Sequence, residues 1–283
     1  MTICDATPAA APPVTARHDP VEIANDTFVI QATADAGGDV AVHMNAMVIR
    51  GPEPIIVDTG VPALRDRYLD DMFSLVDPED VRWVFLSHDD VDHYGNLDAV
   101  MAACPNATLL TSWFQWERLG QLPGIAPHRM RWLDAGDTFE ANGRTYVAAR
   151  PPLFDSPTTR GLLDTATGVY WASDCFATMV PHAMANTAEL DPAAWLAGCY
   201  VNAQQLSPWL TLVDPGRYHG IVERFSRLGA TAIASCHSPT ITGERIERAV
   251  QMLHDVIDLA PIEVPGQAVL DEMIAASMAA PAS

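Results

Sequence analysis

The residues best suited to chemistry form one hexapeptide, HDDVDH, at positions 88–93. It follows a short apolar strand and precedes a helix, so we place it in a loop at a strand end. Alternating residues of such a loop can converge on one side, which predicts two sets of metal ligands: His88 with Asp90, and Asp92 with His93. Imidazole and carboxylate groups bind zinc, iron and manganese. Two adjacent sets predict a pair of ions, which is held best when a carboxylate bridges them.

Two more strand ends offer metal-binding side chains. Asp174 ends the run VYWASD, and His237 ends the run AIASCH. An isolated His-Asp-Asp after a strand is more often a solvated turn or a helix cap. Three such loops on one rim of a sheet instead favour a metal centre.

The surrounding elements follow from hydrophobic periodicity and turn residues. Strands are expected at 27–33, 41–50, 54–58, 81–87, 107–111, 145–149, 168–173 and 231–235. Helices are expected at 62–76, 96–103, 218–228 and 245–257. This alternation predicts one α/β domain at 21–260, between a flexible N-terminal tail at 1–20 and a C-terminal tail at 261–283 with one short helical possibility.

Composition excludes several kinds of function. The 283 residues carry 16 basic and 36 acidic side chains, a net charge of −20, and every basic residue is arginine. A catalytic lysine, a lysine Schiff base and a P-loop lysine are therefore excluded. The negative charge argues against nucleic-acid and anionic-membrane partners. Five scattered cysteines without a CxxC pair favour a reducing cytoplasm. No apolar run long enough to span a membrane and no signal peptide is expected.

Several motifs together resemble the metallo-β-lactamase superfamily. They are VDTG at 57–60, SHDDVDHYGN at 87–96, GDTF at 136–139, WASDCF at 171–176 and SCHSP at 235–239. The superfamily's usual HxHxDH motif is HxDxDH here. In having a carboxylate at that position, the motif resembles that of the flavodiiron and oxygen-binding di-iron branch, which usually has glutamate there. The stretches 44–49, 96–112 and 136–176 also resemble that branch. The resemblance implies a single-domain α/β (α+β) fold, a four-layer αββα sandwich with the metals at its rim.

The resemblance also implies a ligand set. Metal one would bind His88, Asp90 and a bridging Asp174, and metal two would bind Asp92, His93, His237 and the same bridge. Asp90 and Asp92 are the candidates for direct participation in the chemistry, and Asp58 would support the metal loop through hydrogen bonds. The family's metals are two non-haem irons that reduce O₂ or NO. The carboxylate at position 90 adds a hard oxygen ligand to site one, which favours iron or manganese without excluding zinc.

The sequence departs from the family in two respects. Phe154 stands where the family has a further histidine ligand, and the neighbouring Asp155 is a possible substitute. Flavodiiron proteins also carry a flavodoxin domain, and no FMN phosphate-binding loop is visible here. A redox cycle would then need a separate electron-donor protein. The resemblance gives only a weak expectation that the chain forms a homodimer.

Three functions remain open at this point. The first is a di-iron oxidoreductase acting on O₂ or a similar small oxidant. The second is a zinc- or manganese-dependent hydrolase that activates a bound water, although the charge of −20 argues against its nuclease members. The third is a gas or redox sensor that binds without turnover.

Overall fold

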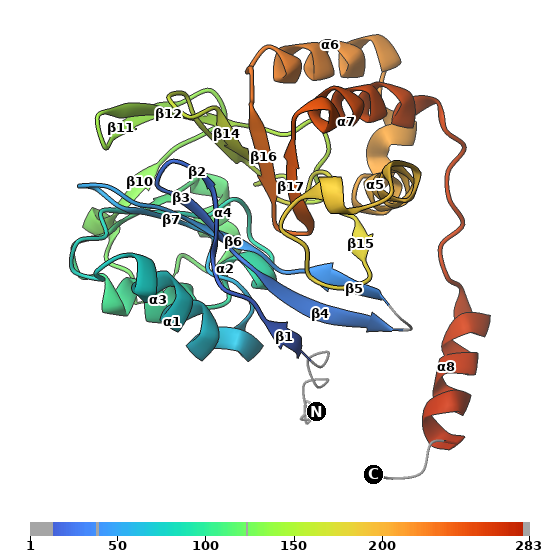
Figure 1. The fold of residues 1–283 in the computed structure, drawn as a ribbon, viewed down its shortest axis with the longest axis horizontal. Coiled ribbons are helices and arrows are strands. Elements are labelled where there is room, and N and C mark those ends of the chain that lie inside the picture. Colours follow the sequence, from blue (N-terminus) through green and yellow to red (C-terminus); the bar gives the residue numbers. More distant parts are fainter. Residues whose placement is uncertain (1–13, 38–39, 123, 280–283) are drawn as a thin grey trace.

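The computed structural model describes residues 14–37, 40–122 and 124–279, and two β-sheets stacked face to face form its centre (Figure 1). The first sheet contains, in spatial order, β10 (Met130–Trp132), β9 (Thr108–Thr111), β8 (Trp83–Phe85), β7 (Ile55–Val57), β6 (Ala46–Ile49), β3 (Thr27–Ile30) and β2 (Val21–Ala24). The second contains β11 (Thr138–Ala141), β12 (Arg144–Ala149), β13 (Gly161–Asp164), β14 (Val169–Trp171), β16 (Ala232–Ser235) and β17 (Ser238–Thr242). Their central strands are short apolar runs because both faces of each sheet are covered.

Helices cover the outer face of each sheet. On the first lie α1 (Arg65–Leu75) and α3 (Leu97–Ala103), and on the second lie α5 (Pro192–Leu206), α6 (Pro215–Ser226) and α7 (Glu244–Asp255), on the opposite side in Figure 1. Shorter helices are α2 (Val91–Tyr94), α4 (Trp113–Arg118), η1 (Pro62–Leu64), η2 (Pro127–Arg129), η3 (Thr187–Glu189), η4 (Pro208–Leu212) and η5 (Val256–Asp258). The predicted four-layer αββα sandwich is confirmed.

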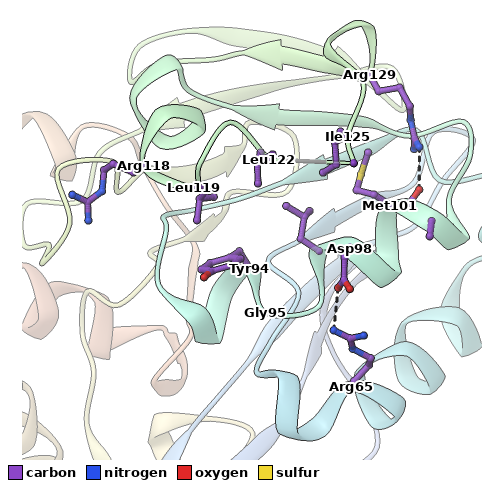
Figure 2. A pocket seen from close by; sticks show the side chains of 13 residues that line it. Arg65, Tyr94, Gly95, Asp98, Met101, Arg118, Leu119, Leu122, Ile125 and Arg129 are labelled. Carbon is purple, nitrogen blue, oxygen red and sulfur yellow. Dashed lines mark hydrogen bonds and ion pairs between the residues drawn. The ribbon is translucent and has the colours of Figure 1, made fainter. Parts of the chain in front are cut away.

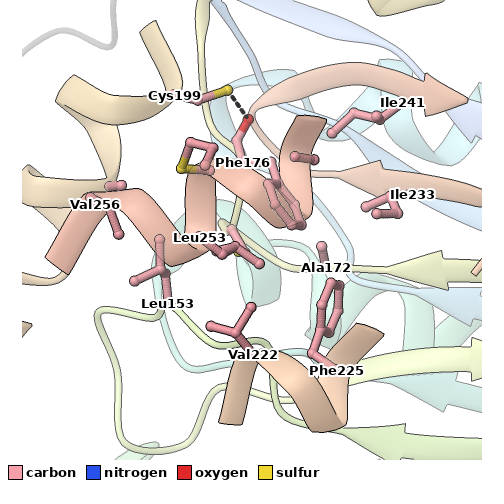
Figure 3. Close-up of a cluster of buried hydrophobic side chains, with 14 of the residues drawn as sticks. Leu153, Ala172, Phe176, Cys199, Val222, Phe225, Ile233, Ile241, Leu253 and Val256 are labelled. Carbon is pink, nitrogen blue, oxygen red and sulfur yellow. Dashed lines mark hydrogen bonds between the residues drawn. The ribbon is translucent and has the colours of Figure 1, made fainter. Parts of the chain in front are cut away.

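Three apolar clusters fill the spaces between the four layers. Met72 of α1 packs with Val84 of the first sheet, and Trp171 packs with Phe85 between the two sheets. Figure 3 shows the third cluster, where side chains such as Phe225 join α6 and α7 to the second sheet. Each fully buried side chain of this size contributes about 1.5–3 kcal/mol. The layers therefore form a firm support for the loops at their rim.

A smaller third sheet differs from the sequence expectation. It contains β1 (Val14–Arg17), β4 (Ala32–Gly37), β5 (Val40–His43) and β15 (Met179–Val180). The strand predicted at 41–50 is broken between β5 and β6, which belong to different sheets. A long-range contact lies at the break, since the Asn45 Nδ2 donates to the carbonyls of Ser235 and Ser238 at 2.9 and 3.0 Å.

The two chain ends also refine the predicted domain limits. Val14–Arg17 pairs with β4 although the sequence assigns it to the tail, and residues 1–13 lie outside the described residues. The helical possibility in the C-terminal tail is α8 (Gln267–Ala279), which stands apart from the sandwich in Figure 1; residues 280–283 are again outside. Within the described residues, no helix has the length and apolar character needed to cross a membrane.

Candidate metal centre

The predicted loops meet because parallel strands end at the same rim. β7 and β8 are parallel neighbours in the first sheet, and β14 and β16 are parallel neighbours in the second. Asp58 follows β7, and the HDDVDH loop follows the end of β8. Asp174 and His237 follow β14 and β16. Residues far apart in the sequence thus face one another across the two sheets.

The three histidines of the centre share one arrangement. Each ring has its Nδ1 beside an oxygen of a neighbouring element, which fixes the ring and turns its Nε2 into the centre. The pairs are His88 with Ser173 Oγ at 3.0 Å, His93 with Asp58 Oδ2 at 2.8 Å, and His237 with the His43 carbonyl oxygen at 2.7 Å. Metal-binding histidines are oriented in this way in proteins, because the partner at Nδ1 leaves a lone pair on Nε2.

Asp174 lies between the three Nε2 atoms. Its Oδ1 is 2.8 Å from His93 Nε2 and 3.4 Å from His237 Nε2, and its Oδ2 is 3.5 Å from His88 Nε2. Two ligands that each bind one ion at about 2.1 Å are about 3.0–3.4 Å apart. These separations therefore fit a carboxylate that bridges two ions.

The aspartates around Asp174 divide the centre into two halves. Site one faces His88 Nε2, with Asp90 Oδ2 at 3.7 Å and Asp155 Oδ1 at 3.9 Å. Site two contains His93, His237 and Asp92, whose Oδ2 lies 3.1 Å from His237 Nε2. All the predicted ligands are thus brought to one place.

His93 Nε2 and Asp174 Oδ1 form a close ion pair at 2.8 Å, but neither of these buried atoms, nor His88 Nε2, makes a hydrogen bond. An unsatisfied buried polar atom costs about 1–3 kcal/mol, so three of them converging at one point need a further partner. Two imidazole nitrogens and a carboxylate oxygen are donors that transition metals accept. The residues present therefore fit metal ions, one in each half of the centre.

The electrostatics of the centre support the same interpretation. Burial raises the pKa of Asp174, but the nearby rings of His93, His237 and His88 hold it well below its usual value. Burial opposes the charged form of His93, yet Asp174 and other anionic neighbours raise its pKa well above normal. Burial and the Asp174 carboxylate raise the pKa of Asp155. Without an ion, protons on the histidines balance the crowded carboxylates.

The structure shows how the side chains of Phe154 and Asp155 lie relative to site one. The Phe154 ring turns toward Trp209, with 4.8 Å between ring centroids. Its backbone N–H donates to Ser207 Oγ at 3.0 Å, and its carbonyl accepts from Trp209 Nε1 at 2.8 Å. Phe154 therefore does not plug site one, and the next side chain, Asp155, faces it.

Asp89 is a member of the HDDVDH loop to which the sequence assigned no role. Its carboxylate accepts hydrogen bonds from the hydroxyls of Ser156 and Thr158, and Arg118 donates to its other oxygen. Burial alone would raise the Asp89 pKa, but these donors lower it. Because Ser156 follows Asp155 directly, Asp89 ties the loop of Asp155 to the loop of His88.

Asp58 lies behind the centre and accepts four hydrogen bonds. Two come from Ser87, through its backbone N–H at 2.7 Å and its hydroxyl at 2.6 Å, one from Trp171 Nε1 at 2.9 Å, and one from His93 Nδ1. Asp58 and Ser173 have left-handed backbones, with φ of 57° and 54°. Such conformations cost about 1–2 kcal/mol for non-glycine residues. The two strand ends are strained where they position the centre.

A separate pocket of about 630 Å³ lies between α2, α3 and the segment after α4, and Figure 2 shows its lining side chains. Apolar residues such as Leu119 and Leu122 form much of its wall, together with Tyr94 and Arg118. Tyr94 directly follows His93, but no candidate metal ligand lines this pocket. It is therefore distinct from the metal centre.

Comparison with known proteins gives a consistent group of relatives. Residues 41–112 match the metallo-beta-lactamase superfamily. The chain is 29% identical over 135 residues to a putative diflavin flavoprotein A 2 of Nostoc sp., covering 47% of this chain and 23% of that protein. It is 22% identical over 178 residues to an anaerobic nitric oxide reductase flavorubredoxin of Salmonella arizonae, covering 60% and 36%. The chain thus spans about a quarter to a third of these relatives.

Solved structures share the fold. A rubredoxin oxygen:oxidoreductase of Desulfovibrio gigas superposes with a TM-score of 0.72 at 16% identity, covering 86% of this chain and 63% of that one. The flavodiiron protein of Giardia intestinalis gives 0.73 at 14% identity, covering 86% and 60%. A fragment, residues 1–254, of a putative diflavin flavoprotein A 5 of Nostoc gives 0.68 at 17% identity, covering 87% and 96%. The chain carries a metallo-beta-lactamase domain whose relatives in sequence and fold are flavodiiron proteins.

Proposed function

We propose that this protein is a metal-dependent oxidoreductase that acts on O₂, NO or a similar small oxidant at a two-metal centre. The observation that carries the proposal is the convergence of three fixed Nε2 atoms on the Asp174 carboxylate, with further aspartates on both sides. Iron bound there would supply one-electron redox chemistry.

The ligand assignment follows from the two halves of the centre. His88, Asp90 and Asp155 would hold the ion of site one, and Asp92, His93 and His237 that of site two. Asp174 would contribute one oxygen to each. The abundance of oxygen ligands favours iron or manganese over zinc.

The exposure of the carboxylates supports one direction of approach for a small molecule. The Asp90 side chain is 51% exposed, whereas those of Asp155 and Asp92 are 23% and 19% exposed and that of Asp174 is 4% exposed. A diatomic molecule would therefore approach over Asp90, with Asp174 at the floor. Burial raises the pKa of Asp92, but His93 and His237 lower it to about 2, so Asp92 acts as an anion there and not as a proton donor.

The proposed reaction also needs electrons, and we assign their delivery to a redox partner. The relatives named as an oxygen:oxidoreductase and as a nitric oxide reductase support reduction of these oxidants. Four described cysteines are free and buried, which agrees with the reducing cytoplasm as the place of action.

The test is anaerobic loading of the full chain with Fe²⁺, followed by O₂ or NO and an artificial reductant. We expect two irons per chain and steady consumption of one oxidant. Asp92→Asn should abolish consumption, and the exposed Asp98→Asn, whose side chain is 70% exposed, should not. An iron-loaded protein that consumes neither oxidant would contradict the proposal.

The same experiment can favour the hydrolase instead. Asp92 and a metal-bound water offer the parts that hydrolysis requires. Turnover of an ester, thioester, lactone or phosphodiester by the zinc-loaded protein, with no oxidant consumed by the iron-loaded one, would select that alternative. A reversible spectral change with O₂ and no reductant consumption would select the sensor.

A further inference from the structure

The two halves of the centre offer different donor atoms. Around His88 Nε2, site one places carboxylate oxygens of Asp90, Asp155 and Asp174 at 3.5–3.9 Å. A single imidazole with three carboxylates is a hard, oxygen-rich donor set. Such sets suit Mn²⁺ and Fe²⁺ better, relative to zinc, than nitrogen- and sulfur-rich sets do.

Site two is richer in nitrogen and has sulfur beside it. Ligand atoms of Asp92, His93, Cys236 and His237 all lie within 4.8 Å of one another. The Cys236 thiol is buried, and its Sγ is 4.0 Å from Asp92 Oδ2. His93 Nε2 is buried beside Asp174 Oδ1 at 2.8 Å but makes no hydrogen bond, so it is available to bind an ion. Two imidazoles and a thiol beside the carboxylates of Asp92 and Asp174 form a softer set than the single imidazole and three carboxylates of site one, so site two favours zinc more than site one does.

The hard character of site one depends on the loop that carries Asp155. The Asp89 side chain, 4% exposed, accepts from Ser156 and Thr158 in that loop and from Arg118 in α4. The backbone of Phe154, on the other side of Asp155, is bound to Ser207 and Trp209. The chain is therefore held on both sides of Asp155, whose Oδ1 lies 3.9 Å from His88 Nε2.

We propose that the two sites discriminate between metals, so that site two takes zinc while site one keeps manganese or iron. A protein supplied with both kinds of ion then holds a mixed pair. Zinc binds more tightly than manganese to most sites of this kind. The two sites therefore differ in the ratio of zinc affinity to manganese affinity, which is larger at site two. The inference rests on the proposed function only in requiring that both sites bind an ion.

The test loads the metal-free full chain with one equivalent of Zn²⁺ and an excess of Mn²⁺, and then removes unbound metal. Metal analysis should give about one zinc and one manganese per chain. Electron paramagnetic resonance should show isolated Mn²⁺ and not an exchange-coupled pair. A coupled manganese signal, or chains with two zincs beside chains with two manganese ions, would overturn the proposal.

Variants assign each ion to its site. Asp155→Asn should lose most of the manganese and keep the zinc. Cys236→Ser should keep both ions but lower the ratio of zinc affinity to manganese affinity at site two by about tenfold. If the serine variant does not fold, Cys236→Ala replaces it in the test.

The control is the exposed Asp98→Asn, which should bind both ions as the parent protein does. Loss of zinc in Asp155→Asn would contradict the assignment. No readout here involves turnover, so the two proposals fail separately: a mixed zinc and manganese pair, together with an iron-loaded protein that consumes no oxidant, would reject the proposed function alone.

Discussion

The histidine rings of the centre depend on groups that a bound metal would not touch. Asp58 Oδ2 is hydrogen-bonded to Nδ1 of His93, and the carbonyl oxygen of His43 is hydrogen-bonded to Nδ1 of His237. Groups of this kind set the direction of a ligand and typically alter metal affinity by about 10–100-fold. A substitution at such a residue changes the orientation of a histidine ring without removing a metal ligand.

Replacing Asp58 tests this dependence. In Asp58→Asn, the amide can still accept from Ser87 or Trp171, but its NH₂ faces donors and the negative charge behind His93 is lost. We expect the dissociation constant for the ion of site two to rise about 10–100-fold, measured by competition with a chelator. The exposed Asp98→Asn should leave it unchanged, and an unchanged constant in Asp58→Asn would contradict the role.

Asp89 gives a second prediction at this scale. Asp89→Asn removes the charge that Arg118 and the Ser156 and Thr158 hydroxyls contact, so the loop of Asp155 loosens. The ion of site one should bind about tenfold more weakly, while site two keeps its affinity. Equal losses at both sites would indicate general damage to the fold. Thr158→Val should show a smaller effect of the same kind.

At the scale of elements, the sequence predicts the strand ends well and their tertiary contacts poorly. The strands before Asp58, His88, Asp174 and His237 are short apolar runs, so the loops after them could be located from local pattern alone. The Asp89 contacts could not, because Ser156 and Thr158 are 67 and 69 residues away in the sequence.

The break between β5 and β6 is another feature without a local signal. Asn45 bonds to carbonyls 190 and 193 residues further along the chain. In the sequence it is one polar residue within an otherwise strand-like segment. The orientation of Phe154 is similar, since Ser207 and Trp209 lie more than 50 residues away. Features made by long-range hydrogen bonds thus escaped prediction.

The buried side chain of Arg160 joins several segments of the chain through hydrogen bonds, and its replacement tests what they contribute to stability. The residue is 1% exposed, and its guanidinium donates to the carbonyls of Leu133 and Leu86 and to Gln115 Oε1. Arg160→Met leaves these buried acceptors short of donors, so the free energy of unfolding should fall by about 3–5 kcal/mol in urea titrations. The matched Arg131→Met removes an exposed arginine that donates to the Thr138 carbonyl, and it should cost under about 1 kcal/mol. Equal losses would contradict the account.

The whole molecule should be sensitive to acid. Burial lowers the pKa of His43 from 6.5 to about 4, although Asn45 opposes the shift. The unfolded chain then binds a proton that the folded one excludes, so stability falls as pH drops below about 6.5 and the loss is complete below about 4. The full contribution is about 3 kcal/mol. Urea unfolding of the metal-free protein at several pH values should show this slope.

His43→Gln provides the control for that slope. Glutamine does not titrate, so the difference in unfolding free energy between the two proteins should itself depend on pH. Between about pH 6.5 and 4 the parent protein should lose more stability than the variant. Parallel pH profiles for the two proteins would show that His43 is not the group responsible.

The most direct test of the two-metal centre is anomalous X-ray scattering at the iron edge from crystals of the iron-loaded protein. The structure predicts two peaks on either side of Asp174. One should lie among His88, Asp90 and Asp155, and the other among Asp92, His93 and His237. A single peak, or peaks elsewhere in the molecule, would contradict the account.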